Sequence, residues 1–538
     1  MAAKRSIGSS RRRARSGSSS GCRLPLAGAL TALIFACCLL ALAASASAAP
    51  ASAAPSACFG QARLALASLH QARLTVATGG EKYLGNAVAI SGDTALVGAP
   101  GYASDAHTGA AYVFVRSGGV WKLQKKLVAP DGAADDDFGG SVAISGTTAL
   151  VGASSHDVAG VGQAGAAYVF VRSSGVWKLQ KELTRSVPTA SDFFGDSVAL
   201  SGDTALVGVP GMDWFALPDA GGACVYVRSG GTWSLQPTLI PDDLDPNDDF
   251  GGSVAISGNT AVVGAPWHDT GGKSDAGAAY VFVRSNGVWT GQMPDLHAGD
   301  AAIQDEFGFS VAVSGNTAVI GAPRRDTGGK ANAGAAYVFV RSSGAWGQQA
   351  QLTADDGNAQ DEAGYSVAVT GGRALLGSPG NSGGGIFHNG ATYDFARSGI
   401  TWAQQRKLTA ADNAEDAQFG SSVALGGETG LIGAPDWGAM GGTSYGAAYV
   451  FQPEPTITKL TPASGKRGIV VTIRGDAFGR TRSGGYIRFG AAKCLRYVSW
   501  RDTAIKCQVP ATAAFGALKV KVTITAGSSN TKTFTVVH

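Results

Sequence analysis

The sequence predicts an all-β protein built around a seven-bladed β-propeller, and two observations lead to this fold class. First, a phrase of the form G-x-S-V-A, followed after a small turn by a run such as V-G-A-P, recurs along the chain. Its first glycines are Gly85, Gly139, Gly195, Gly251, Gly308, Gly364 and Gly420, at steps of 54, 56, 56, 57, 56 and 56 residues. So steady a period indicates an array of one supersecondary unit. Second, each unit has the pattern of four strands and no helix.

The second copy illustrates the four strands. Residues 141–145 alternate between polar and apolar, 148–152 form a small apolar run, 165–172 are β-branched and aromatic, and 176–183 alternate again. The links Ser-Gly-x-Thr and Arg-Ser-x-Gly are typical of hairpin turns, where glycine supplies the positive φ. Four antiparallel strands, repeated in this way, describe a propeller blade.

The outermost strand of a blade carries a tryptophan, and this residue occurs once less often than the inner motif. The six tryptophans are Trp121, Trp177, Trp233, Trp289, Trp346 and Trp402. The last repeat ends after its third strand, at 447–452, whereas residues 69–76 before the first repeat have the pattern of an outer strand. We therefore expect the N-terminal strand to complete the last blade and to close a ring over residues 69–452, which removes its free edges.

The repeated phrases carry a family resemblance. Phe250-Gly251, Gly264-Ala265-Pro266 and the strand 277–282 resemble the FG-GAP repeats of the integrin α-subunit head and its bacterial relatives. That family's calcium loop between the first and second strands is replaced here by a short Ser-Gly-x-Thr turn, which cannot wrap a cation. We therefore carry over none of that family's metal sites, and we assign no metal ligand and no cofactor.

The N-terminus is typical of an exported protein. Residues 1–49 contain seven basic and no acidic side chains, then an apolar run and the small-residue stretch 45–49. We interpret this segment as an export signal, with an uncleaved anchor as the alternative. Residues 50–68 form an Ala/Ser-rich lead-in. Both interpretations predict a secreted or cell-surface protein.

The composition changes after residue 452. Residues 453–455 are a proline-containing linker, and the segments 457–465, 470–479, 487–490 and 505–510 resemble the immunoglobulin-like IPT/TIG domain. The resemblance implies a β-sandwich over 456–538 that acts as a spacer or a partner-binding module.

The cysteines of the exported part fall into two groups. Cys494 and Cys507 flank one short segment of the C-terminal domain, and in an exported protein this favours a disulfide. Cys224 takes a position where other repeats have tyrosine, so we expect a buried small hydrophobic side chain. Cys58, in the lead-in, is left without an assigned partner.

Charge separates the two domains. The chain has 43 basic and 39 acidic side chains, net +4, whereas residues 455–538 carry +12 and residues 50–454 carry −15. We expect the basic domain to bind anionic envelope polymers, and no nucleic acid is expected as a partner. The residues chosen for this role are Lys466, Arg467, Arg480, Arg482 and Arg488. The alternative is that they only solvate the surface or contact the acidic propeller.

One face of the propeller is predicted to bind a ligand. The links between blades and those between the second and third strands emerge on the same side, and both are rich in carboxylates. The candidate residues are Asp105, His107, His156, Asp157, Asp213, Trp214, Trp267, His268, Asp269, Arg325, Asp326, Asp436 and Trp437. Two alternatives stay open for the acidic loops: aspartates that cap their own turns, and weak cation binding.

Signals for catalysis are few. Residues 380–384 fit G-x-S-x-G but lie in a propeller loop, without the strand-turn-helix context of a nucleophile elbow. No zinc spacing, P-loop or dinucleotide fingerprint is present. The leading hypothesis is an exported, non-enzymatic binding or adhesion protein whose propeller face recognises an extracellular protein or glycan. The alternatives are a carbohydrate-active enzyme with a site in the propeller mouth, and a structural spacer.

Overall fold

The computed structural model describes residues 69–76, 82–101, 108–117, 120–215, 217–412, 414–436, 445–478, 482, 485–501, 503–524 and 527–538. Several sequence-based predictions lie outside these residues: the export signal, the lead-in with Cys58, and the candidate side chains Asp105, His107, Trp437 and Arg480.

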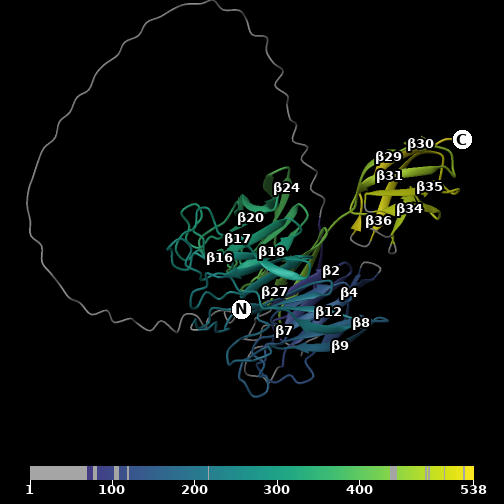
Figure 1. Cartoon of the computed structure of the whole chain (residues 1–538). Coiled ribbons are helices and arrows are strands. Elements are labelled where there is room, and N and C mark those ends of the chain that lie inside the picture. Colours follow the sequence, from purple (N-terminus) through teal and green to yellow (C-terminus); the bar gives the residue numbers. More distant parts are fainter. Residues whose placement is uncertain are drawn as a thin grey trace, which may run out of the picture. The chain divides into compact units, whose positions relative to one another are not determined.

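Residues 69–453 form seven four-stranded antiparallel sheets, the blades (Figure 1). The innermost strands are β2 (Val88–Ser91), β6 (Val142–Ser145), β10 (Val198–Ser201), β14 (Ser253–Ser257), β18 (Ser310–Ser314), β22 (Ser366–Thr370) and β26 (Ser422–Gly426). The second strands are β3 (Thr94–Ala99), β7 (Thr148–Ala153), β11 (Thr204–Val209), β15 (Thr260–Ala265), β19 (Thr317–Ala322), β23 (Arg373–Ser378) and β27 (Thr429–Ala434).

The two outer strands of each blade are longer on average. The third strands are β4 (Ala110–Ser117), β8 (Ala166–Ser173), β12 (Gly222–Ser229), β16 (Ala278–Ser285), β20 (Ala335–Ser342), β24 (Ala391–Ser398) and β28 (Ala447–Pro453). The outermost strands are β5 (Val120–Leu127), β9 (Val176–Leu183), β13 (Thr232–Leu235), β17 (Val288–Leu296), β21 (Ala345–Leu352), β25 (Thr401–Leu408) and β1 (Leu69–Leu74). Blades 1 to 7 are numbered by their innermost strands, from β2 to β26.

The blades close into a ring. The innermost strands contact one another in the cyclic order β2, β6, β10, β14, β18, β22, β26 and back to β2. The seventh blade has the strand order β26-β27-β28-β1, and β1 pairs antiparallel with β28 from Leu69↔Pro453 to Leu74↔Ala448. The prediction that the N-terminal strand completes the last blade is therefore confirmed.

The recurrent glycines and serines join neighbouring blades. Gly139 has a φ of 97°, and a Cβ atom there would lie 2.3 Å from the Ala110 carbonyl oxygen. A Cβ on Gly152 would lie 2.0 Å from the carbonyl oxygen of Gly195 in the next blade. The Ser141 hydroxyl donates to that same carbonyl at 2.7 Å. The equivalent serine makes this bond in six of the seven blades, whereas blade 1 has Ala87 there and donates from Asn86 to the Gly140 carbonyl instead.

Side chains grow larger from the axis outward. The second strands are buried and consist mainly of small and β-branched residues. Farther out, Phe138 packs edge-on against Tyr168, with ring centroids 5.4 Å apart. On the outermost strand, the Trp177 indole N–H donates to Gln124 of the preceding blade at 3.0 Å, while the Arg172 guanidinium lies over its ring.

The C-terminal domain is a two-sheet β-sandwich. One sheet has the order β29 (Thr456–Thr461), β31 (Val470–Asp476), β35 (Ala504–Gln508) and β34 (Tyr497–Arg501). The other contains β30 (Ser464–Gly465), β38 (Lys532–Val536), β36 (Gly516–Ile524), β32 (Tyr486–Phe489) and β33 (Ala492–Lys493), with β37 (Gly527–Ser528) paired to β36.

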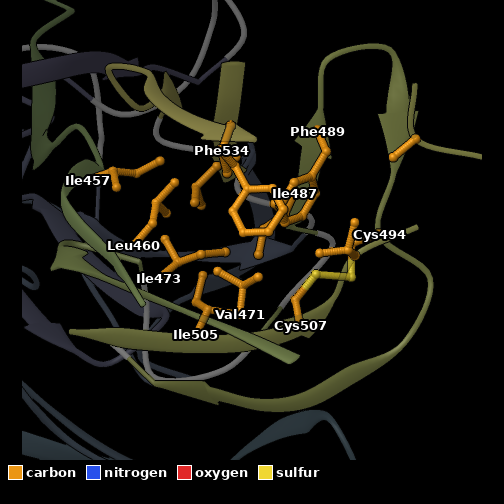
Figure 2. Close-up of a cluster of buried hydrophobic side chains, with 14 of the residues drawn as sticks. Ile457, Leu460, Val471, Ile473, Ile487, Phe489, Cys494, Ile505, Cys507 and Phe534 are labelled. Atoms are coloured by element: carbon orange, nitrogen blue, oxygen red, sulfur yellow. A yellow bond between two sulfur atoms is a disulfide. The ribbon is translucent and has the colours of Figure 1, made fainter. Parts of the chain in front are cut away.

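Figure 2 shows the core between these sheets, where Cys494 and Cys507 form the expected disulfide beside Val471 and Ile505. Cys224, in the propeller, is a buried free thiol, and burial raises its pKa. This agrees with its expected role as a small core residue. Among the described residues, no helix has the length and apolar character needed to cross a bilayer.

Candidate functional site

The candidate site is the face of the propeller that carries the links between blades and the links between second and third strands. We call it the connection face. Neighbouring links are bonded to each other: the Ser191 and Phe193 amides donate to the carbonyls of Gly162 and Gln163, at 3.1 and 3.2 Å. A parallel bridge joins Gly221 to Phe250 in the same manner. The loops of this face are therefore held as a continuous layer.

A row of buried aspartates organises the connection face. These anchor aspartates come three residues before the recurrent glycine: Asp136, Asp192, Asp248, Asp305 and Asp361. Each accepts a hydrogen bond through Oδ2 from the backbone amide three residues earlier, at 2.6 to 2.8 Å. Aspartate is a common turn residue, and this hydrogen bond fixes five of the seven links between blades.

Three predicted site residues are partners of anchor aspartates. His156 Nδ1 lies 2.8 Å from Asp136 Oδ2, and His268 Nδ1 lies 2.9 Å from Asp248 Oδ2. Arg325 donates to Asp305 at 3.0 Å. The hydrogen bond that the His268 ring donates to Asp248 raises the pKa of His268, although burial opposes it. These side chains thus connect the two kinds of loop.

Four predicted aspartates close their own loops. Asp157, Asp213, Asp269 and Asp326 each accept the backbone amide six residues later, at 2.8 to 3.0 Å. They are exposed, but each already accepts a hydrogen bond from its own loop, which supports the turn-capping interpretation for these positions. Trp267 and Asp436 are half-buried.

Each loop that is capped by one of these aspartates contains the same tight turn. The turn of blade 3 differs from the others in its side chains. Antiparallel bridges join Val158 to Val161, Trp214 to Leu217, Thr270 to Lys273 and Thr327 to Lys330. The first turn residue has positive φ in every copy and is Ala159, Phe215, Gly271 or Gly328. Phe215 is 92% exposed and Trp214 is 38% exposed, with their ring centroids 4.9 Å apart. Blade 3 therefore presents an aromatic pair to solvent.

Beside the anchor aspartates stands an exposed row, the rim aspartates: Asp131, Asp243, Asp300, Asp356 and Asp412. In blade 2, the Tyr168 hydroxyl donates to Asp131 at 2.9 Å. Burial, together with Asp131, Glu182 and Asp136, raises the pKa of this tyrosine. Potential ligand atoms of Asp131, His156 and Glu182 lie within 4.8 Å of one another. A depression of about 360 Å³ adjoins them, lined by Asp131, Ala133, Asp135, Ser155, His156 and Gln163 among others.

The predicted polyanion-binding residues lie on the C-terminal domain. Lys466, Arg467, Arg482 and Arg488 are exposed. Arg467 donates to the Ala513 carbonyl at 2.7 Å and Arg488 donates to the Ala491 carbonyl at 2.7 Å. Arg482 lies over the ring of Tyr497, 4.8 Å from its centroid.

Neither Phe215 nor Glu182 is among the residues predicted from the sequence. Both are found by aligning the repeats position by position and asking which copy departs from the others. Phe215 replaces glycine in a left-handed turn. Glu182 precedes the last leucine of its strand, where blades 6 and 7 have Lys407 and Arg73.

A closed seven-bladed ring with a carboxylate-rich face, followed by a β-sandwich, defines a propeller of the integrin-head type joined to an immunoglobulin-like domain. The FG-GAP repeat model matches residues 71–114, 121–170, 177–226, 233–282, 289–339, 346–395 and 402–451, and the IPT/TIG domain model matches residues 455–536. The chain therefore belongs to the FG-GAP repeat family and ends in an IPT/TIG domain. Both domain types are typical of extracellular proteins, and the combination fits an extracellular binding module.

Several curated relatives match a short part of the chain. Cyclomaltodextrin glucanotransferase of Niallia circulans is 38% identical over 92 residues, which are 17% of this chain and 13% of the enzyme. The Paenibacillus macerans enzyme is 38% identical over 100 residues, 18% of this chain and 14% of the enzyme. The chain thus spans less than one-sixth of these relatives. A solved fungal alcohol oxidase of the AA5 family aligns over 88% of this chain and 100% of its own, at 11% identity and a TM-score of 0.44, and carries no argument about function.

Proposed function

We propose that the chain is an exported, non-enzymatic binding or adhesion protein, and that its connection face recognises an extracellular protein or glycan. The observation that carries this proposal is the exposed aromatic pair of blade 3. A phenylalanine in the left-handed region costs about 1 kcal/mol relative to glycine, and Phe215 regains little of it by packing because its side chain is almost fully exposed. Trp214 beside it enlarges the apolar surface.

Exposed aromatic side chains on a rigid turn are typical of binding surfaces. They offer a large contact area with few rotatable bonds, and they can stack on sugar rings or enter an apolar pocket of a partner. The bridge between Trp214 and Leu217 and the Asp213 cap hold the turn in place before any ligand arrives. Val187, Ile303 and Phe387 are further exposed apolar side chains on links of the same face.

The variant F215G tests this role, because it restores the residue found in blades 4 and 5. We expect an unchanged or slightly higher melting temperature and the loss of most binding on an array of extracellular polysaccharides and surface proteins. I400A serves as a control, since Ile400 is an exposed apolar residue in a hairpin of the opposite face. Equal binding by wild type and F215G would contradict the proposal, and release of shorter sugars from an arrayed polysaccharide would favour the enzyme alternative.

A further inference from the structure

The cluster in blade 2 brings one imidazole and two carboxylates together from three elements. Asp131 belongs to the link between blades 1 and 2, His156 to the link between β7 and β8, and Glu182 to β9. Asp131 is exposed, Glu182 is half-buried and His156 is buried. Since their potential ligand atoms lie within 4.8 Å of one another, small side-chain rotations can direct all three at one ion.

The imidazole of His156 is already oriented for such a role. Nδ1 lies 2.8 Å from the carboxylate of Asp136, so a neutral ring with its hydrogen on Nδ1 keeps Nε2 free to ligate. Asp136 is itself held by the Ala133 amide at 2.6 Å. A carboxylate that receives the second ring hydrogen is the usual support of a metal-bound histidine.

In three other blades the rim aspartate is paired with a positive charge. Asp300, Asp356 and Asp412 each accept a hydrogen bond from a tyrosine, as Asp131 does. Their other oxygen is paired with a protein cation: Arg325 at 2.8 Å, Lys407 at 2.8 Å and Arg73 at 2.5 Å, respectively. Glu182 lies opposite Tyr168 in the register where Lys407 lies opposite Tyr393. Within the described part of the chain, neither Asp131 nor Glu182 forms an ion pair.

We propose that Asp131, His156 and Glu182 bind one divalent transition-metal ion of the zinc class, with Asp136 as the positioning residue for the imidazole. One nitrogen and two carboxylate oxygens suit zinc and its neighbours in the first transition row, whereas calcium and magnesium prefer oxygen ligands alone. The adjoining depression gives the ion access from solvent and leaves room for water as a further ligand. This inference is independent of the proposed binding role of Phe215.

Blade 4 carries a weaker version of the same arrangement. Asp243, His268 and Asp295 occupy the corresponding positions. Here, however, His297 Nδ1 lies 3.4 Å from Asp295, so one of the two carboxylates already has a partner. We therefore place the ion in blade 2.

The experiment titrates ZnCl₂ into the untagged, metal-free full chain by calorimetry and follows the melting temperature. We expect one ion per chain and a higher melting temperature with zinc, and a tetrahedral absorption spectrum with cobalt(II). The variant H156N/E182K copies the asparagine and lysine of blade 6, so it should fold normally and lose both effects. D136N should bind zinc about 10 to 100-fold more weakly.

The reciprocal variant N381H/K407E transfers the cluster to blade 6 and should raise the stoichiometry to two. The proposal is overturned if wild type shows neither heat nor a thermal shift with zinc. It is equally overturned if folded H156N/E182K binds zinc as tightly as wild type does, or if CaCl₂ matches ZnCl₂ in affinity and H156N/E182K leaves both unchanged.

Discussion

At the scale of single residues, one position of the repeat performs different tasks in different blades. The partner of the anchor aspartate is His156 in blade 2, His268 in blade 4, Arg325 in blade 5 and Asn381 in blade 6. All four satisfy a buried carboxylate, although arginine carries a permanent charge and asparagine carries none. The repeated backbone thus accepts side chains of different charge at equivalent positions of the repeat.

His268 makes stability depend on pH. Because Asp248 raises its pKa in the folded protein, the stabilisation is fully present below the unfolded value of about 6.5 and is lost as pH rises through the folded value. The loss in free energy of unfolding caused by H268N should therefore be largest near pH 5.5 and smallest near pH 8.5, as measured by urea denaturation. In a D248N background this pH dependence should vanish. A loss that is constant across the range would argue against the ion pair.

At the scale of elements, strand β1 is the piece on which the ring depends. It covers the edge of β28 over Leu69–Leu74, and Leu74 is buried in the cluster between the last and first blades. Arg73 extends from the same strand to pair with Asp412. The strand therefore contributes hydrogen bonds, apolar burial and an ion pair to a blade whose other strands come from the far end of the propeller sequence.

Deletion of residues 69–76 should destabilise the propeller and promote self-association. Loss of Leu74 burial alone is expected to cost about 2 kcal/mol, and the uncovered edge of β28 becomes free to pair with another chain. Thermal unfolding and light scattering measure the two effects. A chain that begins at Ala67 is the control and should remain monomeric and fully stable. A deletion variant with the stability and size of this control would contradict the closure of the ring by β1.

At the scale of the whole molecule, charge divides the chain into an acidic propeller region and a basic C-terminal domain, with net charges of −15 and +12. Lys466, Arg482 and Arg488 are exposed on the basic domain. Their charges reach solvent without an ion pair among the described residues. This is the surface that we propose for contact with anionic envelope polymers.

Binding of the full chain to a teichoic-acid-like polyanion should fall steeply between about 50 mM and about 0.5 M salt, because exposed charges are screened. The variant K466Q/R482Q/R488Q should bind more weakly at low salt, whereas K122Q/K178Q/K181Q on the outer propeller strands should bind as wild type does. Surface plasmon resonance at two salt concentrations decides the matter. Absence of binding at low salt would leave the C-terminal domain as a spacer.

Much of the fold could be predicted from the sequence because its signals are local and repeated seven times. The steady period and the turn residues predicted the blades. The count of six outer-strand tryptophans for seven inner motifs predicted closure by residues 69–76, and the structure confirms both predictions. The site was harder to predict, because the partners of Asp131 come from loops and strands more than 20 residues away. Sequence alone also could not show that Asp157 and its equivalents already bind their own loops.

The pairing of Leu69 with Pro453 also has a mechanical consequence. The two ends of the propeller sequence leave the ring at the same end of one antiparallel strand pair. Tension applied between the N-terminal segment and the C-terminal domain would pull that pair apart rung by rung, starting at Leu69, rather than sliding one strand along the other. The hydrogen bonds would be loaded one after another and not all together. Under tension, the ring therefore opens between β1 and β28, while the other six blades carry little load.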